Sequence, residues 1–212
     1  MPQHWAIWFA VEGDLRFLSH HDTMRCVERT ALRALVPLRF SQGFNPRPAV
    51  SLACPRPVGV ASRADVAVMT MDDSAAEMEA PALADALSAA SPRGMTFLRA
   101  RRLTDRKTLH PRRIEYALGV EADLPPRLAQ RLSELEAQDS WTVVRDSGLD
   151  KASRRIDLKP MVHDIRIEGP SVRWSQSPQG QAWARPSEVL ALLGLDPQAD
   201  LSRVVRLDVE YD

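Results

Sequence analysis

The order of strand-like and helix-like patterns in the first half of this chain constrains its fold most. Large apolar residues, Trp5, Ile7, Phe9 and Val11, stand at every second position over 5–11 and share one face, which predicts a strand. After Ser19, a possible helix cap, apolar residues recur at helical spacing and predict a buried stripe of Met24, Val27, Ala31 and Leu35. The expected elements are a strand at 5–11, a turn at 12–14, a helix from 20 to 35, short strands at 38–40 and 49–54, a strand at 65–71, a helix at 77–90 and a strand at 95–99. This βαββαβ order is typical of a ferredoxin-like domain.

A weaker version of the same order follows in the second half. The expected elements are a strand at 113–120, a helix at 126–138, strands at 141–145, 155–159, 162–167 and 172–175, a helix at 186–193 and a strand at 203–210. Residues 99–113, between the halves, carry many basic side chains against one acid, Asp105, and favour a domain boundary there. The sequence therefore predicts an α+β fold of two tandem ferredoxin-like (βαββαβ) domains, 1–104 and 105–212, the second with extra hairpin strands.

The charge composition gives mixed evidence about nucleic acid as a partner. The chain has 28 basic and 28 acidic residues, and a net charge of zero argues against it. However, the only lysines are Lys107, Lys151 and Lys159, so 25 of the 28 basic residues (28 − 3) are arginine. Arginine forks onto phosphate and stacks on bases, which lysine does not do. A high-GC genome that favours arginine codons would give the same bias, so both explanations stay open.

Nothing in the sequence indicates a membrane or a prosthetic group. The start does not resemble a signal peptide, and no apolar stretch approaches the roughly 20 residues that span a bilayer. We therefore expect a cytoplasmic protein without membrane association. Cys26 and Cys54 are too few and too far apart for a disulfide framework or a metal cluster. We expect ordinary thiols, no metal and no cofactor.

Residues 41–48 (SQGFNPRP) match neither a regular helix nor an ordinary strand. Gly43 permits a positive φ, Asn45 precedes a proline, and Pro46 and Pro48 lack backbone donors. A segment that fixes so many residues without regular hydrogen bonding usually shapes a surface. We expect a recognition loop between two strands.

The helix before this loop carries arginines at a spacing of four, which form either a solvated face or a docking surface for an anion. Single-stranded RNA would suit both features, because arginines hold phosphates and aromatic rings such as Phe44 stack on bases. The alternative is that Phe44 packs into the core and the arginines pair with Glu28 and neighbouring acids. The predicted binding residues are Ser19, His20, Asp22, Arg25, Arg29, Arg33, Gln42, Gly43, Phe44, Asn45 and Arg47, with His20 and Asp22 fixing the loop.

Catalytic chemistry is less evident in the sequence. His20 and His21 fall in the first turn of the expected helix, where a neutral histidine could act as a general base. The alternative is that one is solvated and the other bonds within the loop. Ser19 and Asp22 complete no nucleophilic triad with them, because neighbours on one helical turn point in different directions. The other histidines show no metal-ligand spacing.

Several motifs occur in the order found in one bacterial family. They are GDLRFLSHHD at 13–22, Arg25 with Glu28-Arg29, PLRFSQGFNPRP at 37–48, PVGV at 57–60 and, more weakly, IDLKP at 156–160 and ARPSEVL at 184–190. In these residues nearly the whole chain resembles the radical SAM-linked protein family, a domain of unknown function encoded beside or fused to a radical S-adenosylmethionine (SAM) enzyme. Two positions depart from the family pattern. His21 stands where leucine is usual, and Arg63-Ala64 stand where an acid is common, with Asp65 one residue on.

This resemblance implies no established activity. The family's frequent neighbours, which include the radical enzyme, ribonuclease G and ribosomal proteins, point to RNA or ribosome-related work. We therefore expect a non-catalytic accessory module that presents RNA or a ribosome-related substrate to a radical SAM enzyme. One rival is a metal-independent ribonuclease of tandem ferredoxin-like fold that uses His20, and another is a purely structural protein-binding partner.

Overall fold

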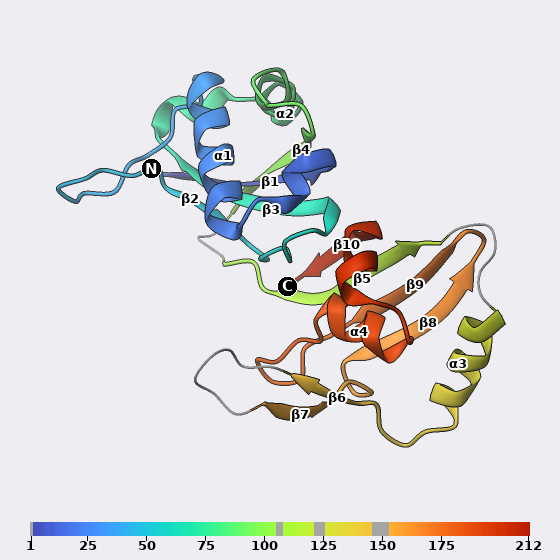
Figure 1. The fold of residues 1–212 in the computed structure, drawn as a ribbon. Helices are drawn as coiled ribbons and strands as arrows, with labels where there is room; N and C mark the ends of the chain where they lie inside the picture. Colours follow the sequence, from blue (N-terminus) through green and yellow to red (C-terminus); the bar gives the residue numbers. More distant parts are fainter. Residues whose placement is uncertain (1, 105–107, 121–125, 146–152) are drawn as a thin grey trace. The chain divides into compact units, whose positions relative to one another are not determined.

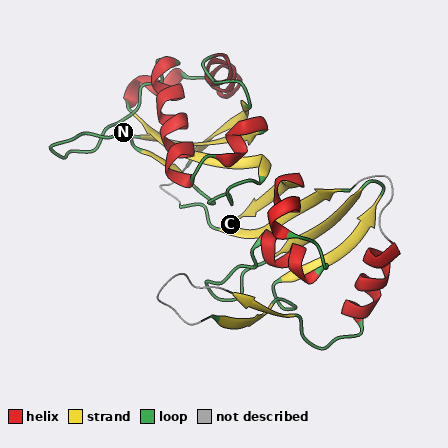
Figure 2. Cartoon of the chain, in the orientation of Figure 1, coloured by secondary structure: helices red, strands yellow, loops and turns green. Residues whose placement is uncertain are grey.

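The computed structural model describes residues 2–104, 108–120, 126–145 and 153–212 and has an α+β fold (Figures 1 and 2). Two compact units divide the chain: unit 1 contains residues 1–111 and 211–212, and unit 2 contains residues 112–210. The boundary expected between residues 104 and 105 falls beside residues 105–107, which lie outside the described part. No helix in the described part of the chain is long and apolar enough to cross a membrane.

Unit 1 has the predicted order of strands and helices. Its elements are β1 (Gln3–Val11), the 3-10 helix η1 (Gly13–Phe17), α1 (His20–Arg33), β2 (Val50–Leu52), β3 (Ala61–Met71), the 3-10 helix η2 (Asp73–Glu77), α2 (Ala80–Ala89) and β4 (Met95–Leu103). The strands lie in the order β4-β1-β3-β2, and each neighbouring pair is antiparallel. The sheet thus places the first and third strands at its centre.

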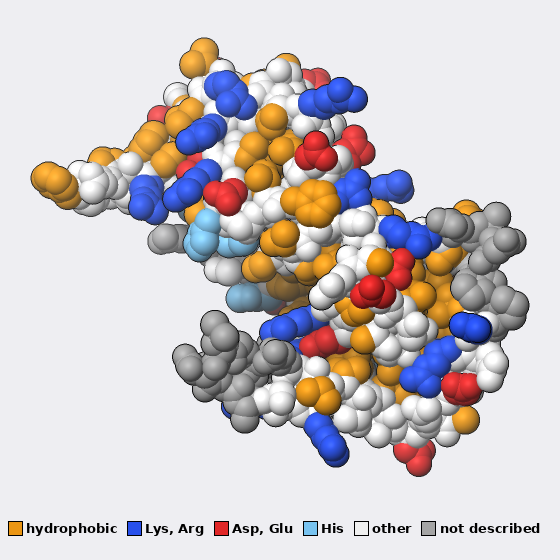
Figure 3. Space-filling view, in the orientation of Figure 1, with side chains coloured by type: hydrophobic (Ala, Val, Ile, Leu, Met, Phe, Trp, Pro, Cys, Tyr) orange, Lys and Arg blue, Asp and Glu red, His pale blue; other side chains and the backbone are white. Residues whose placement is uncertain are grey.

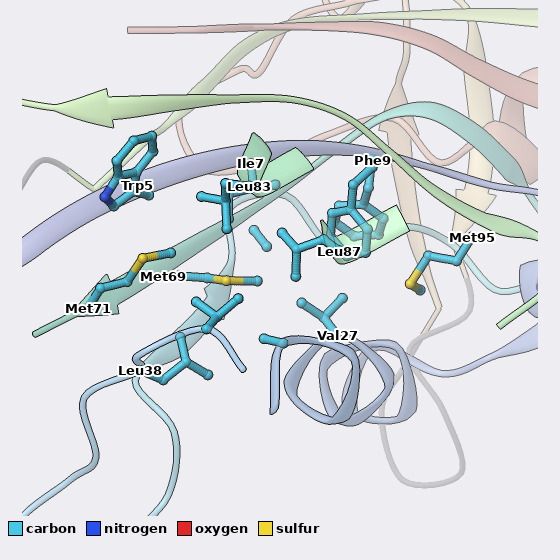
Figure 4. Close-up of a cluster of buried hydrophobic side chains, with 14 of the residues drawn as sticks. Trp5, Ile7, Phe9, Val27, Leu38, Met69, Met71, Leu83, Leu87 and Met95 are labelled. Atoms are coloured by element: carbon cyan, nitrogen blue, oxygen red, sulfur yellow. The ribbon is translucent and has the colours of Figure 1, made fainter. Parts of the chain in front are cut away.

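The alternation in β1 separates two apolar faces. Trp5, Ile7 and Phe9 pack against α1 and α2, where Val27 and Leu87 belong to the same core (Figure 4). Successive strand residues point to opposite faces, so His4, Ala6 and Trp8 lie on the face away from these helices. There a smaller cluster joins Ala6, Trp8, Val66 and Leu109. We call this second surface the back face of unit 1.

The buried stripe of α1 differs from the prediction at both ends, because Met24 is only half-buried and the helix does not reach Leu35. The helix stops at Arg33, and Leu35 is 87% exposed. Leu35 has φ 55°, so the chain turns there and carries the side chain away from the core. The buried side of α1 is instead made of Thr23, Val27, Thr30 and Ala31. Because Thr23 and Thr30 are polar, a search for apolar residues at helical spacing does not find this part of the buried stripe.

Three other elements differ locally from their predictions. The strand expected at 38–40 is reduced to isolated bridges, Leu38 with Met71 and Phe40 with Pro48. The turn expected at 12–14 is the start of η1. Helix α2 begins at Ala80 rather than at residue 77, because Pro81 fits only the first helical turn and the preceding residues form η2.

Unit 2 contains a sheet and a separate hairpin. Its elements are β5 (Pro111–Gly119), α3 (Pro126–Glu136), β6 (Thr142–Arg145), β7 (Arg154–Asp157), β8 (Val162–Glu168), β9 (Ser171–Gln176), α4 (Pro186–Leu192), α5 (Pro197–Asp200), the 3-10 helix η3 (Leu201–Arg203) and β10 (Val204–Tyr211). The strand order is β10-β5-β9-β8, and among the described strands β6 pairs with β7 alone. Tyr116 stacks on Trp174 at 5.5 Å between ring centroids in the core. The extra hairpin predicted for this half is therefore confirmed.

Candidate recognition surface

The loop at residues 41–47 projects from unit 1 (Figure 1). Its neck is closed by the backbone N–H of Ser41, which donates to the carbonyl of Arg47 at 2.9 Å, and by the N–H of Arg47, which donates to Oγ of Ser41 at 3.0 Å. Every residue from 41 to 47 is exposed, and the Phe44 side chain is 102% exposed. The alternative in which Phe44 packs into the core is therefore wrong.

Gly43 does not use the positive φ that glycine permits. Among the described residues, the glycines with positive φ are Gly13, Gly59, Gly94, Gly169, Gly180 and Gly194. A Cβ placed on Gly43 would meet nothing within 4 Å. The loop shape therefore depends on its two prolines and on the Ser41–Arg47 neck rather than on a left-handed glycine.

The start of α1 is capped as the sequence predicts. Oγ of Ser19 accepts from the backbone N–H of Asp22 at 3.1 Å and donates to Oδ2 of Asp22 at 2.7 Å. Asp22 also lies 3.5 Å from Arg25. In the described part of the chain, none of these contacts reaches the loop at 41–47, so the structure shows no fixing of the loop by Asp22.

The three arginines of α1 differ in what they contact. Arg33 donates to the carbonyl of Ala90 through Nε at 3.0 Å and through Nη2 at 2.7 Å, and Ala90 is the C-cap of α2. Arg25 pairs with Asp22 rather than with Glu28. Arg29 is exposed. Basic side chains gather over α1 and beside the projecting loop (Figure 3), but Arg33 holds two helices together and is less free to bind a ligand.

Sequence reasoning missed a buried ion pair beneath the start of α1. Nε of Arg56 donates to Oδ2 of Asp65 at 3.2 Å. Nη1 of Arg56 donates to the carbonyls of Arg16 and Val60 at 2.8 and 2.7 Å. Its signals in the sequence are weak: an arginine between two prolines, and one acid at the start of the expected strand 65–71. The pair ties η1, the 55–60 segment and β3 together.

His20 lies beside this ion pair. Together with Thr23, Cys54, Arg56 and Asp65 it lines a cavity of about 10 Å³, room for roughly one water molecule. Nδ1 of His20 is buried and has no hydrogen-bond partner among the described residues. The His20 and His21 rings are arranged edge to face, with 5.6 Å between their centroids. A cavity of this size admits no nucleotide, so any substrate would have to reach His20 from another side.

The described residues contain no group of three His, Cys, Asp or Glu side chains placed to hold a metal ion. Burial raises the pKa of the Cys26 thiol, an effect that nearby Arg33 and Arg29 oppose. A thiol with a raised pKa is a poor nucleophile at neutral pH.

A comparison with protein families matches residues 5–191 to a family described as "Uncharacterized protein conserved in bacteria (DUF2344)". No curated protein matches the chain.

Proposed function

This chain belongs to DUF2344, a family of uncharacterized bacterial proteins, and we propose that it is a non-catalytic module that binds single-stranded RNA for a partner enzyme. The observation that carries this proposal is the complete exposure of Phe44 on a projecting, arginine-flanked loop. The family description assigns no activity, and the exposed side chains of the loop support the proposal.

A fully exposed phenylalanine is unusual because burial of such a ring stabilises a fold by about 1.5–3 kcal/mol. Phe44 contributes none of this to unit 1. Its ring is presented to solvent on a neck closed by hydrogen bonds between Ser41 and Arg47. Such a ring suits stacking on an unpaired base.

The charges around the loop favour RNA over an apolar protein pocket. Arg39 and Arg47 are exposed at its base, and Arg29 is exposed on α1. Arginine binds phosphate with a fork of donors, and aromatic stacking combined with arginine is the usual way in which single-stranded RNA is held. Gln42 and Asn45 supply amide groups for base edges at the loop tip.

We extend the proposal to the fold and the partner. The strand order β4-β1-β3-β2 in unit 1 and the order β10-β5-β9-β8 in unit 2 support two ferredoxin-like domains. The motifs at 13–22 and 37–48, which resemble those of radical SAM-linked proteins, support a radical SAM enzyme as the partner that performs the chemistry. The substrate would be RNA or a ribosome-related particle.

Phe44→Ala tests the proposal. The binding of a fluorescein-labelled oligouridine is measured by anisotropy, and the variant should bind roughly tenfold more weakly than the wild type. Phe17→Ala is the matched control, because Phe17 is 56% exposed in η1, outside the loop. Equal affinity in wild type and Phe44→Ala would remove the loop from the binding site.

The same protein samples separate the rival functions. Defined cleavage products from labelled cellular RNA, lost in His20→Ala, would select the ribonuclease. Salt-insensitive association with the radical enzyme, without RNA retention at low salt, would select a structural partner.

A further inference from the structure

Two arginines cover a tryptophan on the back face of unit 1. Cζ of Arg99 lies 3.9 Å from the centroid of the Trp8 ring, and Cζ of Arg101 lies 5.4 Å from it. In the register of β1 and β4, Arg99 is opposite Trp8 and Arg101 is opposite Ala6. A bulge between Trp8 and Phe9 shifts the pairing at this point. Trp8 itself is only 8% exposed, whereas both arginines are exposed.

These two arginines carry charge that the described part of the chain does not neutralise. Arg56, Arg113 and Arg145 lie within 3.2 Å of carboxylates, whereas Arg99 and Arg101 lie over the Trp8 ring. A guanidinium that rests on a ring keeps its outer face and its N–H edges toward solvent. That outer face can stack on a base, and the N–H edges can bind phosphate.

A groove lies on the same face, toward β2. It has a volume of about 420 Å³ and is lined by His4, Ser51, Val68, Thr70, Thr108 and Leu109, among others. His4 pairs with Thr70, and Ala6 pairs with Val68, so the groove shares the face of Trp8. The His4 Nδ1 and Thr70 Oγ1 atoms are 3.2 Å apart. This volume is within the range of pockets that hold small ligands.

The arginine pair and the groove are offset along β1. Trp8, which Arg99 covers, and His4, which lines the groove, are four residues apart, which is about 13 Å along the strand. A few nucleotides of extended single-stranded RNA cover this distance. Positive charge near Trp8 and polar hydroxyl and imidazole groups near His4 match a phosphate backbone that carries unpaired bases.

We propose that the back face of unit 1 is a second binding surface for single-stranded RNA. A base stacks on Arg99 over Trp8, Arg101 binds the adjoining phosphate, and a base a few nucleotides away enters the groove beside His4 and Thr70. This inference deepens the proposed function and rests on it for the class of ligand. It places RNA on the sheet face away from α1, in addition to the loop.

The test compares Arg99→Gln/Arg101→Gln with a matched control, Arg93→Gln/Arg127→Gln, which removes the same charge from two exposed arginines elsewhere. Oligouridine affinity is measured at several salt concentrations. We expect at least fivefold weaker binding in the first variant and a log–log salt slope lower by about 0.7 for each lost phosphate contact. The control should lose much less affinity.

Arg99→Lys/Arg101→Lys keeps both charges but removes the flat guanidinium. It should bind oligouridine more weakly than the wild type while keeping the salt slope. If the glutamine variant is unstable, this lysine variant tests by itself whether the back face binds RNA. Arginines that only shield Trp8 from water would change the unfolding free energy but not the RNA affinity, and that result would overturn the inference.

The outcomes separate this inference from the loop proposal. If Phe44→Ala weakens binding and Arg99→Gln/Arg101→Gln binds like its control, the back-face surface is refuted while the loop proposal stands. If only the arginine variant weakens binding, the loop proposal fails and the back face holds. A wild-type protein that binds no oligouridine refutes both.

Discussion

Nε of Arg56 and Oδ2 of Asp65 lie 3.2 Å apart, and these two side chains are only 3% and 5% exposed. Further donors of Arg56 reach the carbonyls of Arg16 and Val60. A buried charge that loses its partner is strongly destabilising, because no water replaces the lost contact. The pair therefore joins η1, the 55–60 segment and β3 beneath the start of α1.

Arg56→Met should lower the free energy of unfolding by about 3–5 kcal/mol, because it leaves Asp65 buried without its main cation. Urea denaturation followed by circular dichroism measures the loss. Arg25→Gln is the control: the Arg25–Asp22 pair is 3.5 Å long and largely exposed, so its loss should cost no more than about 0.5 kcal/mol. Similar losses in the two variants would show that the buried pair has no special role.

Arg33 should contribute to the stability of the fold, and Arg29 should contribute to the binding of RNA. Arg33→Gln loses two hydrogen bonds to the carbonyl of Ala90 at the end of α2, which should cost about 1–2 kcal/mol of stability. Arg29→Gln should leave stability within about 0.5 kcal/mol, because Arg29 is exposed, and should weaken the binding of oligouridine. Denaturation and anisotropy on the same samples test both statements, and the reverse pattern would contradict them.

Two glycines should respond oppositely to alanine. Gly94 has φ +90°, and an added Cβ would lie 2.8 Å from the carbonyl oxygen of Glu12. Gly94→Ala should therefore lose about 2 kcal/mol or more. Gly43 has open space around it, and Gly43→Ala should be neutral or stabilising by up to about 1 kcal/mol. A destabilised Gly43→Ala would mean that the loop needs glycine's freedom after all.

The elements of unit 1 were predictable because their residues repeat with a clear period. Trp5, Ile7 and Phe9 alternate, and the order of strands and helices followed from such local patterns. The end of α1 was not predictable in this way, since Leu35 looks like a core residue until its positive φ is known. Periodicity reports which residues could be buried but not where the chain turns.

The candidate site was harder to predict from the sequence than the fold was. A surface-shaping loop at 41–48 was predictable from composition, but the exposure of Phe44 was left open, and the contact between Arg33 and Ala90 joins positions 57 residues apart. The Arg56–Asp65 pair and the Trp8–Arg99 stack likewise depend on strand register and loop path. Such partners become visible only when the backbone is placed, because isolated arginines look alike in a sequence.

Asp72 should make stability depend on pH in the acidic range. Hydrogen bonds from the hydroxyl of Ser74 and then from its backbone N–H lower the pKa of the Asp72 carboxyl. A lowered pKa in the folded state means that the carboxylate stabilises the protein fully above its unfolded pKa of about 3.9. This contribution is lost as the pH falls through the folded pKa.

Asp72→Ala should therefore be less stable than the wild type at neutral pH, and the difference in stability should narrow as the solution is acidified. Urea midpoints measured across the acidic range test this, and a difference that stays constant with pH would show that the capping carboxylate does not act through its charge.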